Sequence, residues 1–250
     1  MRQLLILIFL VGFIGFGQQK DFVWFKSVGQ TKIPDELKHH DAIYIYDHLA
    51  YDYMPNYTTM VTLLRKIKIL NKKSLERYSQ VYIPGSLYPY IETFSGRIIK
   101  PDGTVNELKQ EEIIREGITS NRDDNYFNYA KFVMSGLEVE DEFEIFVRIS
   151  YPGIFLGNDL ILRGPLYSLK SKISITNYLD MDLGVLSSAP LDGFKVENND
   201  HGGRVFVWEQ SNLLPFPKEN YSIPTYETSF LSFSARFNSI FKSDLRKDYT

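Results

Sequence analysis

Residues 142–150 read Glu-Phe-Glu-Ile-Phe-Val-Arg-Ile-Ser, and an apolar residue stands at every odd-numbered position from 143 to 149. The side chains of a β-strand alternate between its two faces, so these apolar residues share one face. Glu142 and Glu144 share the other face, which we expect to meet water. The stretch therefore predicts a β-strand with one buried side and one solvated side.

The same period of two recurs from about residue 41 to residue 209, without the alternating helices of a parallel sheet. Lys66 and Lys68, for example, are expected to point outward, and Ile67 and Ile69 inward. Further strands are expected over residues 42–47, 59–70, 80–83, 91–100, 105–108, 132–134, 160–162, 169–176, 193–197 and 204–208. The predicted fold class is all-β: a mostly antiparallel β-sandwich of about ten or more strands, with a short C-terminal helix.

Two connections have the composition of tight hairpins. Pro101-Asp102-Gly103-Thr104 combines a proline that presets φ, an aspartate that bonds the local backbone and a glycine for the positive-φ position. Residues 198–203, Asn-Asn-Asp-His-Gly-Gly, predict a second hairpin. The polar residues 109–131 predict a loop with one helical turn near 111–115, and residues 71–78 a turn and a brief connector. Asp35–Leu37 after Pro34 predicts one further helical turn.

The first 17 residues have the pattern of a secretory signal peptide. Arg2 supplies a positive start, residues 4–16 are apolar or glycine, and Gly15 and Gly17 precede Gln18 with small side chains. This apolar run is shorter than the roughly 20 residues of a membrane span. We therefore expect an exported, periplasmic or extracellular protein without a transmembrane segment after signal removal; an uncleaved N-terminal anchor is the alternative.

Three further segments complete the predicted organisation. Residues 18–40 are an N-terminal leader, 41–234 the β-sandwich domain, and 235–250 a helical tail or the start of a linker to a missing domain. In the tail region, apolar residues recur at steps of three or four, which is helix spacing. The alternative is a strand to Phe233 with a helix from Arg236. The apolar positions are Phe230, Phe233, Phe237, Phe241 and Leu245.

Composition excludes several classes of protein. The formal net charge of −3 offers no excess of cations for a phosphate backbone, so no nucleic-acid partner is expected. The chain contains no cysteine, which excludes disulfides, thiolate metal sites and cysteine nucleophiles. The aromatic content of 15% favours sheet, because aromatic side chains fit a half-buried pleated surface.

No catalytic, cofactor-binding or metal-binding residue is predicted. His39, His40, His48 and His201 show no metal-binding spacing, and no nucleophile elbow, phosphate-binding loop or dinucleotide fingerprint is present. The run His39-His40-Asp41 would offer ligands to a transition metal if exposed, although a solvated polar cluster is the favoured interpretation.

Carboxylates crowd one short stretch of the sequence. Paired carboxylates are the groups that glycosidases and calcium sites use. We favour a solvated acidic hairpin instead, because Glu142 and Glu144 fall on the outward face and the others in a turn. The stretch comprises Glu138, Glu140, Asp141, Glu142 and Glu144; Asp180 and Asp182 form a second, weaker acidic loop.

Tyrosines at alternate positions are the remaining candidates for a binding surface. Rows of exposed tyrosines can stack on sugars, but they also pack across the strands of a sheet, and we favour packing. The pairs are Tyr44 with Tyr46, Tyr51 with Tyr53, and Tyr88 with Tyr90.

Five runs, taken in order, resemble the domain of unknown function that precedes transglutaminase-like domains in exported bacterial proteins, especially of Bacteroidetes. The resemblance covers residues 41–234 and implies a β-sandwich module of the cell envelope, usually followed by a catalytic Cys-His-Asp domain. Because this chain has no cysteine, no catalytic residue of that family is carried over. The runs are residues 41–47, 65–71, 98–104, 132–138 leading into 144–149, and 208–215.

The sequence and the resemblance together predict a non-catalytic accessory module for scaffolding or partner binding. The partner expected is a transglutaminase-like domain or another envelope protein. A carbohydrate-binding sandwich that uses exposed tyrosines is the first alternative, with a glycan as its ligand. A hydrolase with an unrecognised carboxylate pair is the second.

Overall fold

The computed structural model describes residues 30–84, 87–108, 113–116, 129–154, 159–162, 164–179, 181–187, 194–198, 204–215 and 230–237. The fold is all-β, as predicted, and its one α-helix within these residues is α1 (Lys72–Tyr78). No helix in these ranges has the length and apolar character needed to cross a bilayer. The predicted signal peptide, His201, Asp180 and residues 238–250 lie outside the described residues.

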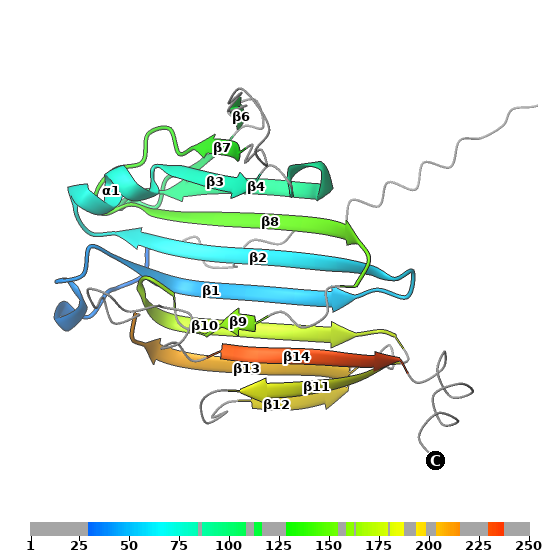
Figure 1. Cartoon of the computed structure of the whole chain (residues 1–250). Helices are drawn as coiled ribbons and strands as arrows, with labels where there is room; N and C mark the ends of the chain where they lie inside the picture. The colour runs from blue at the N-terminus through cyan, green and yellow to red at the C-terminus, as the bar shows by residue number, and fades with distance from the viewer. Residues whose placement is uncertain are drawn as a thin grey trace, which may run out of the picture.

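Eight strands form the main sheet, in the order β12-β13-β10-β1-β2-β8-β4-β5 (Figure 1). All neighbours are antiparallel except β1 and β10, so the sheet is mixed at one junction only. The strands are β1 (Ala42–Tyr53), β2 (Thr58–Ile69), β4 (Ile91–Ile99), β5 (Val105–Glu107), β8 (Glu142–Pro152), β10 (Tyr167–Asn177), β12 (Phe194–Asn198) and β13 (Arg204–Leu213).

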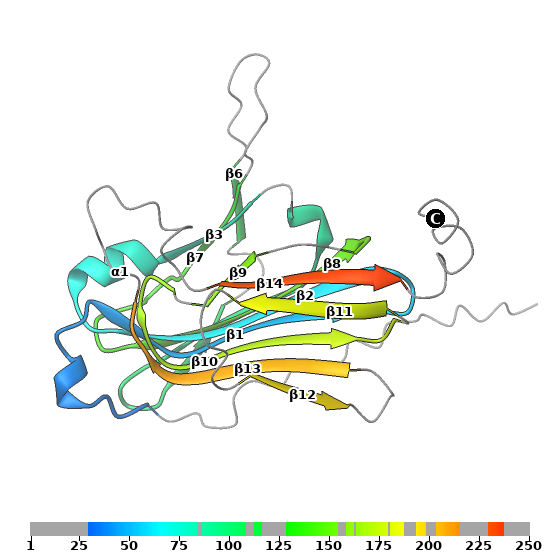
Figure 2. The ribbon, with the colours of Figure 1, turned by 60° about the horizontal axis from the view of Figure 1, so that its bottom comes forward.

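Two three-stranded sheets cover one face of the main sheet (Figures 1 and 2). One has the order β3-β7-β6 and lies over β4 and β8; the other has the order β11-β14-β9 and lies over β10 and β13. They form the second layer of the predicted sandwich. Their strands are β3 (Gln80–Pro84), β6 (Ile113–Glu116), β7 (Tyr129–Val133), β9 (Asp159–Ile161), β11 (Met181–Ser187) and β14 (Phe230–Phe237).

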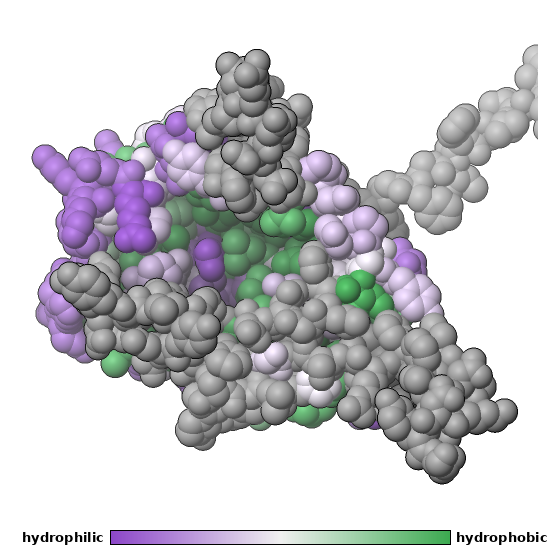
Figure 3. Space-filling model, viewed as in Figure 1, coloured by the Kyte–Doolittle hydropathy of each residue, from purple (hydrophilic) through white to green (hydrophobic). Residues whose placement is uncertain are grey.

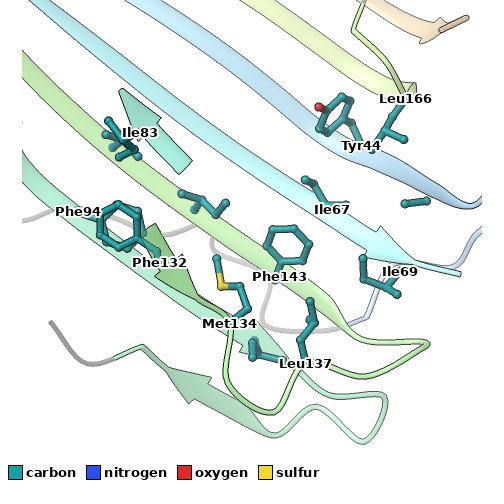
Figure 4. Packing of buried hydrophobic residues seen from close by; sticks show 14 residues of the cluster. Tyr44, Ile67, Ile69, Ile83, Phe94, Phe132, Met134, Leu137, Phe143 and Leu166 are labelled. Carbon is teal, nitrogen blue, oxygen red and sulfur yellow. The ribbon is translucent and has the colours of Figure 1, made fainter. Parts of the chain in front are cut away.

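The covered face carries two hydrophobic clusters, one beneath each small sheet. In the first, Phe94 of β4 stacks on Phe132 of β7 with ring centroids 3.5 Å apart (Figure 4). In the second, Leu160 of β9 packs with Phe206 and Trp208 of β13. Each cluster buries apolar area between layers, which is the main favourable term in folding.

The N-terminal segment covers part of the opposite face. After the short helical turn η1 (Asp35–Leu37), which the sequence predicted, the chain enters β1. Ile33 and Leu37 pack on Ile43 and Tyr167 in a third cluster. The main sheet is therefore buried on both faces at this end.

Two local predictions were wrong, and a third held in part. Residues 113–116 form strand β6 rather than a helical turn, because they pair with β7 across a long connection. Residues 72–78 form helix α1 rather than a connector, because Asn71 and Ser74 make a capping box at its start. In the tail, the alternative of a strand to Phe233 is confirmed, and this strand, β14, continues to Phe237 in place of a helix from Arg236.

A cationic cleft beside helix α1 as candidate functional site

The acidic stretch at the start of β8 is a buried ion-pair ladder. Glu142 and Glu144 are fully buried, and Lys66 is only 3% exposed. Lys66 Nζ lies 2.8 Å from a carboxylate oxygen of Glu142, and Arg97 Nε donates to Glu144. Antiparallel pairing places Lys66 and Arg97 directly opposite Glu144 on the two neighbouring strands. These carboxylates therefore neutralise cations within the sheet.

The prediction that this face meets water was wrong, because the N-terminal segment closes it. The Thr31 backbone N–H donates to Glu142 at 2.6 Å. The Gln30 side-chain oxygen accepts from Lys68 Nζ, and its amide nitrogen donates to the Ile99 carbonyl at 2.8 Å. A buried charge is tolerated when it is paired and hydrogen-bonded, and this segment supplies part of that requirement.

The acidic turn before β8 is also held by a cation. Lys100 Nζ lies 2.8 Å from Glu138 and 2.9 Å from Asp141. Burial disfavours the ammonium form of Lys100, but the hydrogen bonds to these two carboxylates outweigh burial and raise its pKa. The turn is therefore solvated at Glu138 and Glu140, as predicted, while Asp141 is buried and ion-paired.

Two of the three tyrosine pairs, Tyr44 with Tyr46 and Tyr51 with Tyr53, do not form a stacking platform. A β-bulge lies between Tyr44 and Tyr46, so that Tyr44 pairs with Ile67 and Tyr46 with Lys66, on opposite faces of the sheet. Tyr44 is buried, and burial raises its pKa to about 12. Tyr53 is fully buried in the second cluster. The side chain of Tyr88 lies outside the described residues.

A hollow lies between the two small sheets, with hydrophobic surface on its floor (Figure 3). On the same face, Arg65 pairs with Asp47 at 2.7 Å and lies 5.3 Å from the centre of the Tyr44 ring. A pocket of about 60 Å³ beside Asp47 includes Trp208, whose indole N–H has no hydrogen-bond partner in the described part of the chain. That pocket has room for little more than a water molecule or two.

A larger cleft of about 300 Å³ opens where the start of β1, helix α1 and the start of β10 meet. We call it the α1 cleft. Its polar lining comes from His39, His40, Asp41, Lys73, Arg77 and Tyr78, and its apolar lining includes Pro165, Leu166, Tyr167 and Pro215. The volume is at the lower end of the range for small-molecule sites in proteins.

Helix α1 is fixed to the start of β1 by polar contacts around Asp41. Asn71, the N-cap of α1, accepts from the Ser74 backbone and donates its side-chain N–H to Asp41 at 2.7 Å. Lys73 Nζ lies 3.2 Å from the other oxygen of Asp41. Arg77 follows Lys73 by four residues, so both cations stand on the same side of the helix. The capped helix therefore presents two cations to the cleft.

Aromatic rings form another wall of the α1 cleft. His39 and His40 lie with ring centroids 4.1 Å apart, and His40 lies 5.3 Å from the Tyr167 ring. The Nδ1 atom of His39 is within hydrogen-bonding distance of the Glu36 carbonyl, at 2.6 Å. Burial, then the neighbouring His39, lowers the pKa of His40. Within the described ranges, no three metal-ligating side chains converge here or elsewhere.

The sequence singled out His39, His40 and Asp41, and the structure places all three at the α1 cleft. It missed Lys73, Arg77 and Tyr78, because residues 71–78 were interpreted as a connector. The signal that could have found them was the Asn71–Ser74 capping pair, which starts a helix with cations four residues apart. His48 lies elsewhere, on β1, where it is hydrogen-bonded to Ser174 at 2.9 Å.

Comparison with known proteins gives a likeness of fold. No protein-family model and no curated protein matches the chain. A crystal structure described as a "putative protease" from Parabacteroides distasonis ATCC 8503 superposes with a TM-score of 0.63 and 16% sequence identity. The match covers 78% of this chain and 40% of that one.

A second solved structure, native yeast LTA4 hydrolase, matches 78% of this chain and 29% of its own, at 13% identity. Its TM-score of 0.38 is too low to support an inference. The chain thus spans about two fifths of the Parabacteroides structure, and that likeness, at 16% identity, concerns the fold alone.

Proposed function

We propose that the chain is a non-catalytic, exported accessory module of the cell envelope that binds a partner. The observation that carries this proposal is the contrast between two groups of charges. The carboxylates of the acidic stretch, which were the best catalytic candidates in the sequence, are consumed in ion pairs within the sheet. The cations of helix α1 line an open cleft instead. Such a surface is suited to binding rather than to acid–base chemistry.

The accessory role is compatible with the comparison, which concerns the fold alone. The likeness to the Parabacteroides structure spans about two fifths of that chain, so the same fold stands there beside a larger remainder. The protease activity suggested for that protein would, in this proposal, belong to the remainder. For the present chain, a transglutaminase-like domain is the partner that the sequence resemblance favours.

Buried side chains weigh against both alternatives. The carbohydrate hypothesis needed a row of exposed tyrosines, and Tyr44 and Tyr53 are buried. The hydrolase hypothesis needed a free pair of carboxylates, and Glu142 and Glu144 are each within 4 Å of a cationic nitrogen.

The test has an activity arm and a binding arm. The purified full chain is incubated with peptide and glycoside substrate panels, and we expect turnover no higher than with the heat-denatured chain. Activity that copurifies with the chain through two separate columns would overturn the non-catalytic assignment. In the binding arm, sedimentation velocity with a transglutaminase-like domain from the same organism should give a complex. Free sedimentation of both proteins at 100 µM would exclude that partner, since such a complex would then be weaker than about −5.5 kcal/mol.

A further inference from the structure

We propose that the α1 cleft binds a carboxylate attached to an apolar or aromatic group, with Arg77 as its anchor. The inference rests on the proposed function in one respect: the ligand is bound and not converted. No comparison assigns this cleft a ligand.

Charge pairing leaves one cation of the cleft without a counterion. Asp41 is paired with Lys73 at 3.2 Å and also accepts from Asn71 at 2.7 Å. The Arg77 guanidinium lies 5.6 Å from the centre of the Tyr78 ring, and no carboxylate in the described ranges pairs with it. A guanidinium presents a planar fork of N–H donors that matches a carboxylate in two parallel hydrogen bonds.

The balance of charged side chains in the cleft favours a ligand with one negative charge over a ligand with two. Arg77 is one unpaired positive charge, whereas the Asp41 carboxylate stands in the same lining. A phosphate dianion would meet Asp41 with like charge, and only one cation would remain to offset it. A carboxylate is matched by Arg77 alone.

Tyr78 also lines the cleft, and it packs against the hydrophobic core. Its hydroxyl oxygen is buried and has no hydrogen-bond partner among the described residues. Burial raises the pKa of Tyr78. Because the hydroxyl oxygen is buried, a ligand in the open cleft does not reach it, and Arg77 alone anchors the carboxylate.

The walls of the cleft indicate what kind of group is attached to the carboxylate of the ligand. Leu166 and Tyr167 are buried, and Pro165 and Pro215 also line the cleft. Figure 4 shows Leu166 next to Tyr44 at the start of the core, so this wall continues the hydrophobic cluster. The His40 and Tyr167 rings offer flat surfaces on which a planar group can lie. An apolar or aromatic body beside the carboxylate fits these walls.

The test uses two probes that differ only at the charged group: N-acetylphenylalanine and its amide, N-acetylphenylalaninamide. Each is titrated into the purified full chain and followed by ligand-observed NMR. We expect the acid to bind with a dissociation constant in the low millimolar range, and the amide at least tenfold more weakly. Equal affinities of acid and amide, or no binding of either probe up to 20 mM, would overturn the proposal.

Substitutions of Arg77 test whether this residue causes the preference for the acid over the amide. Arg77→Gln should weaken binding of the acid at least tenfold, and Arg77→Lys should lie between it and the native chain, because lysine keeps the charge but loses the fork. The matched control is Arg204→Gln, an exposed arginine at the far end of β13, which should bind as the native chain does. Native-like binding by both Arg77 variants would refute the assignment; if Arg77→Gln fails to fold, Arg77→Lys alone decides.

A third probe separates two sources of the carboxylate. The capped peptide acetyl-Phe-Glu-Phe-amide carries it on a side chain, whereas N-acetylphenylalanine mimics the end of a polypeptide. Tighter binding of the peptide would indicate an internal acidic residue of the partner, and tighter binding of N-acetylphenylalanine a terminal carboxylate. The NMR spectra also report whether the probe stays intact. Conversion of the probe would contradict the non-catalytic function and leave the site standing, whereas absence of binding would remove the site and leave that function untouched.

Discussion

Glu144 shows how a single carboxylate ties three strands together. It accepts from Arg97 of β4 and lies 3.6 Å from Lys66 of β2. Removing one partner of a buried ion pair leaves the other charge uncompensated, which costs about 3–5 kcal/mol. We therefore expect Glu144→Gln to lower the free energy of unfolding by about 3–5 kcal/mol in urea denaturation.

The matched control for Glu144 is Glu138, which also pairs with a lysine but whose side chain is 74% exposed. Exposed ion pairs contribute little, so Glu138→Gln should change the free energy of unfolding by less than about 1 kcal/mol. Equal effects of the two substitutions would show that the ladder is not shielded from water.

His48 makes the stability of the protein depend on pH. Burial, followed by the charge of Lys172, lowers its pKa to about 4, whereas a histidine of the unfolded chain titrates near 6.5. Between these pH values His48 is protonated in the unfolded chain but not in the folded protein. Stability therefore falls as the pH drops from about 6.5 to about 4. Above about pH 6.5 the contribution is constant.

The measurement is the free energy of unfolding between pH 4 and pH 7, for the native chain and for His48→Gln. Glutamine retains a polar group near Ser174 but cannot take up a proton. The native chain should lose about 2–3 kcal/mol more than the variant over this range, an amount that allows for the partial exposure of the ring. Parallel profiles of the native chain and His48→Gln would contradict the assignment to His48.

At the scale of elements, the β4–β5 hairpin is set by its turn. Gly103 has φ of +88°, and a Cβ at this position would meet no atom within 4 Å. A substitution there is opposed by the backbone alone. Gly103→Ala should cost about 1 kcal/mol of stability, measured by thermal or urea denaturation.

Gly103→Asn is the control for that prediction, because asparagine tolerates the left-handed region better than alanine. Its loss should be smaller than that of Gly103→Ala. If alanine proved as stable as glycine, the positive φ would not be what the turn requires.

The tail and the second small sheet show where local pattern misleads. Phenylalanines at 230, 233 and 237 have helix spacing, but Leu231 pairs with Leu160 of β9 and with Ser187 of β11. Strand β14 is hydrogen-bonded to one strand on each side, and this pairing outweighs the helix-like spacing of its apolar residues. Propensity is a weak prior that tertiary pairing overrides.

Across the whole molecule, the sheet is most strongly held at its centre. Strand β1 is paired along its length with β2 on one side and β10 on the other, whereas β12 pairs only with β13 and the three-residue β5 only with β4. Hydrogen exchange should therefore be slowest for amides of β1, β2 and β8, and fastest for β5 and β12. Protection of β12 equal to that of β1 would indicate that another chain covers this edge.

The candidate site could be predicted only in part. His39, His40 and Asp41 attract notice because polar residues of these types are adjacent in the sequence. Arg77 does not, because its role depends on the pairing of Lys73 with Asp41, which lies 32 positions away from Lys73 in the sequence. Which cation is left without a counterion is a property of the folded chain.

The sequence by itself determined the all-β class, the strand at 142–150 and the hairpin at 101–104, because side-chain alternation and turn chemistry depend on neighbours a few positions apart. Only the tertiary structure decided that Glu142 and Glu144 are buried, since the Thr31 N–H that meets Glu142 lies 111 positions away. A local pattern states which residues share a face. Whether that face is exposed to water depends on which distant segments of the chain cover it.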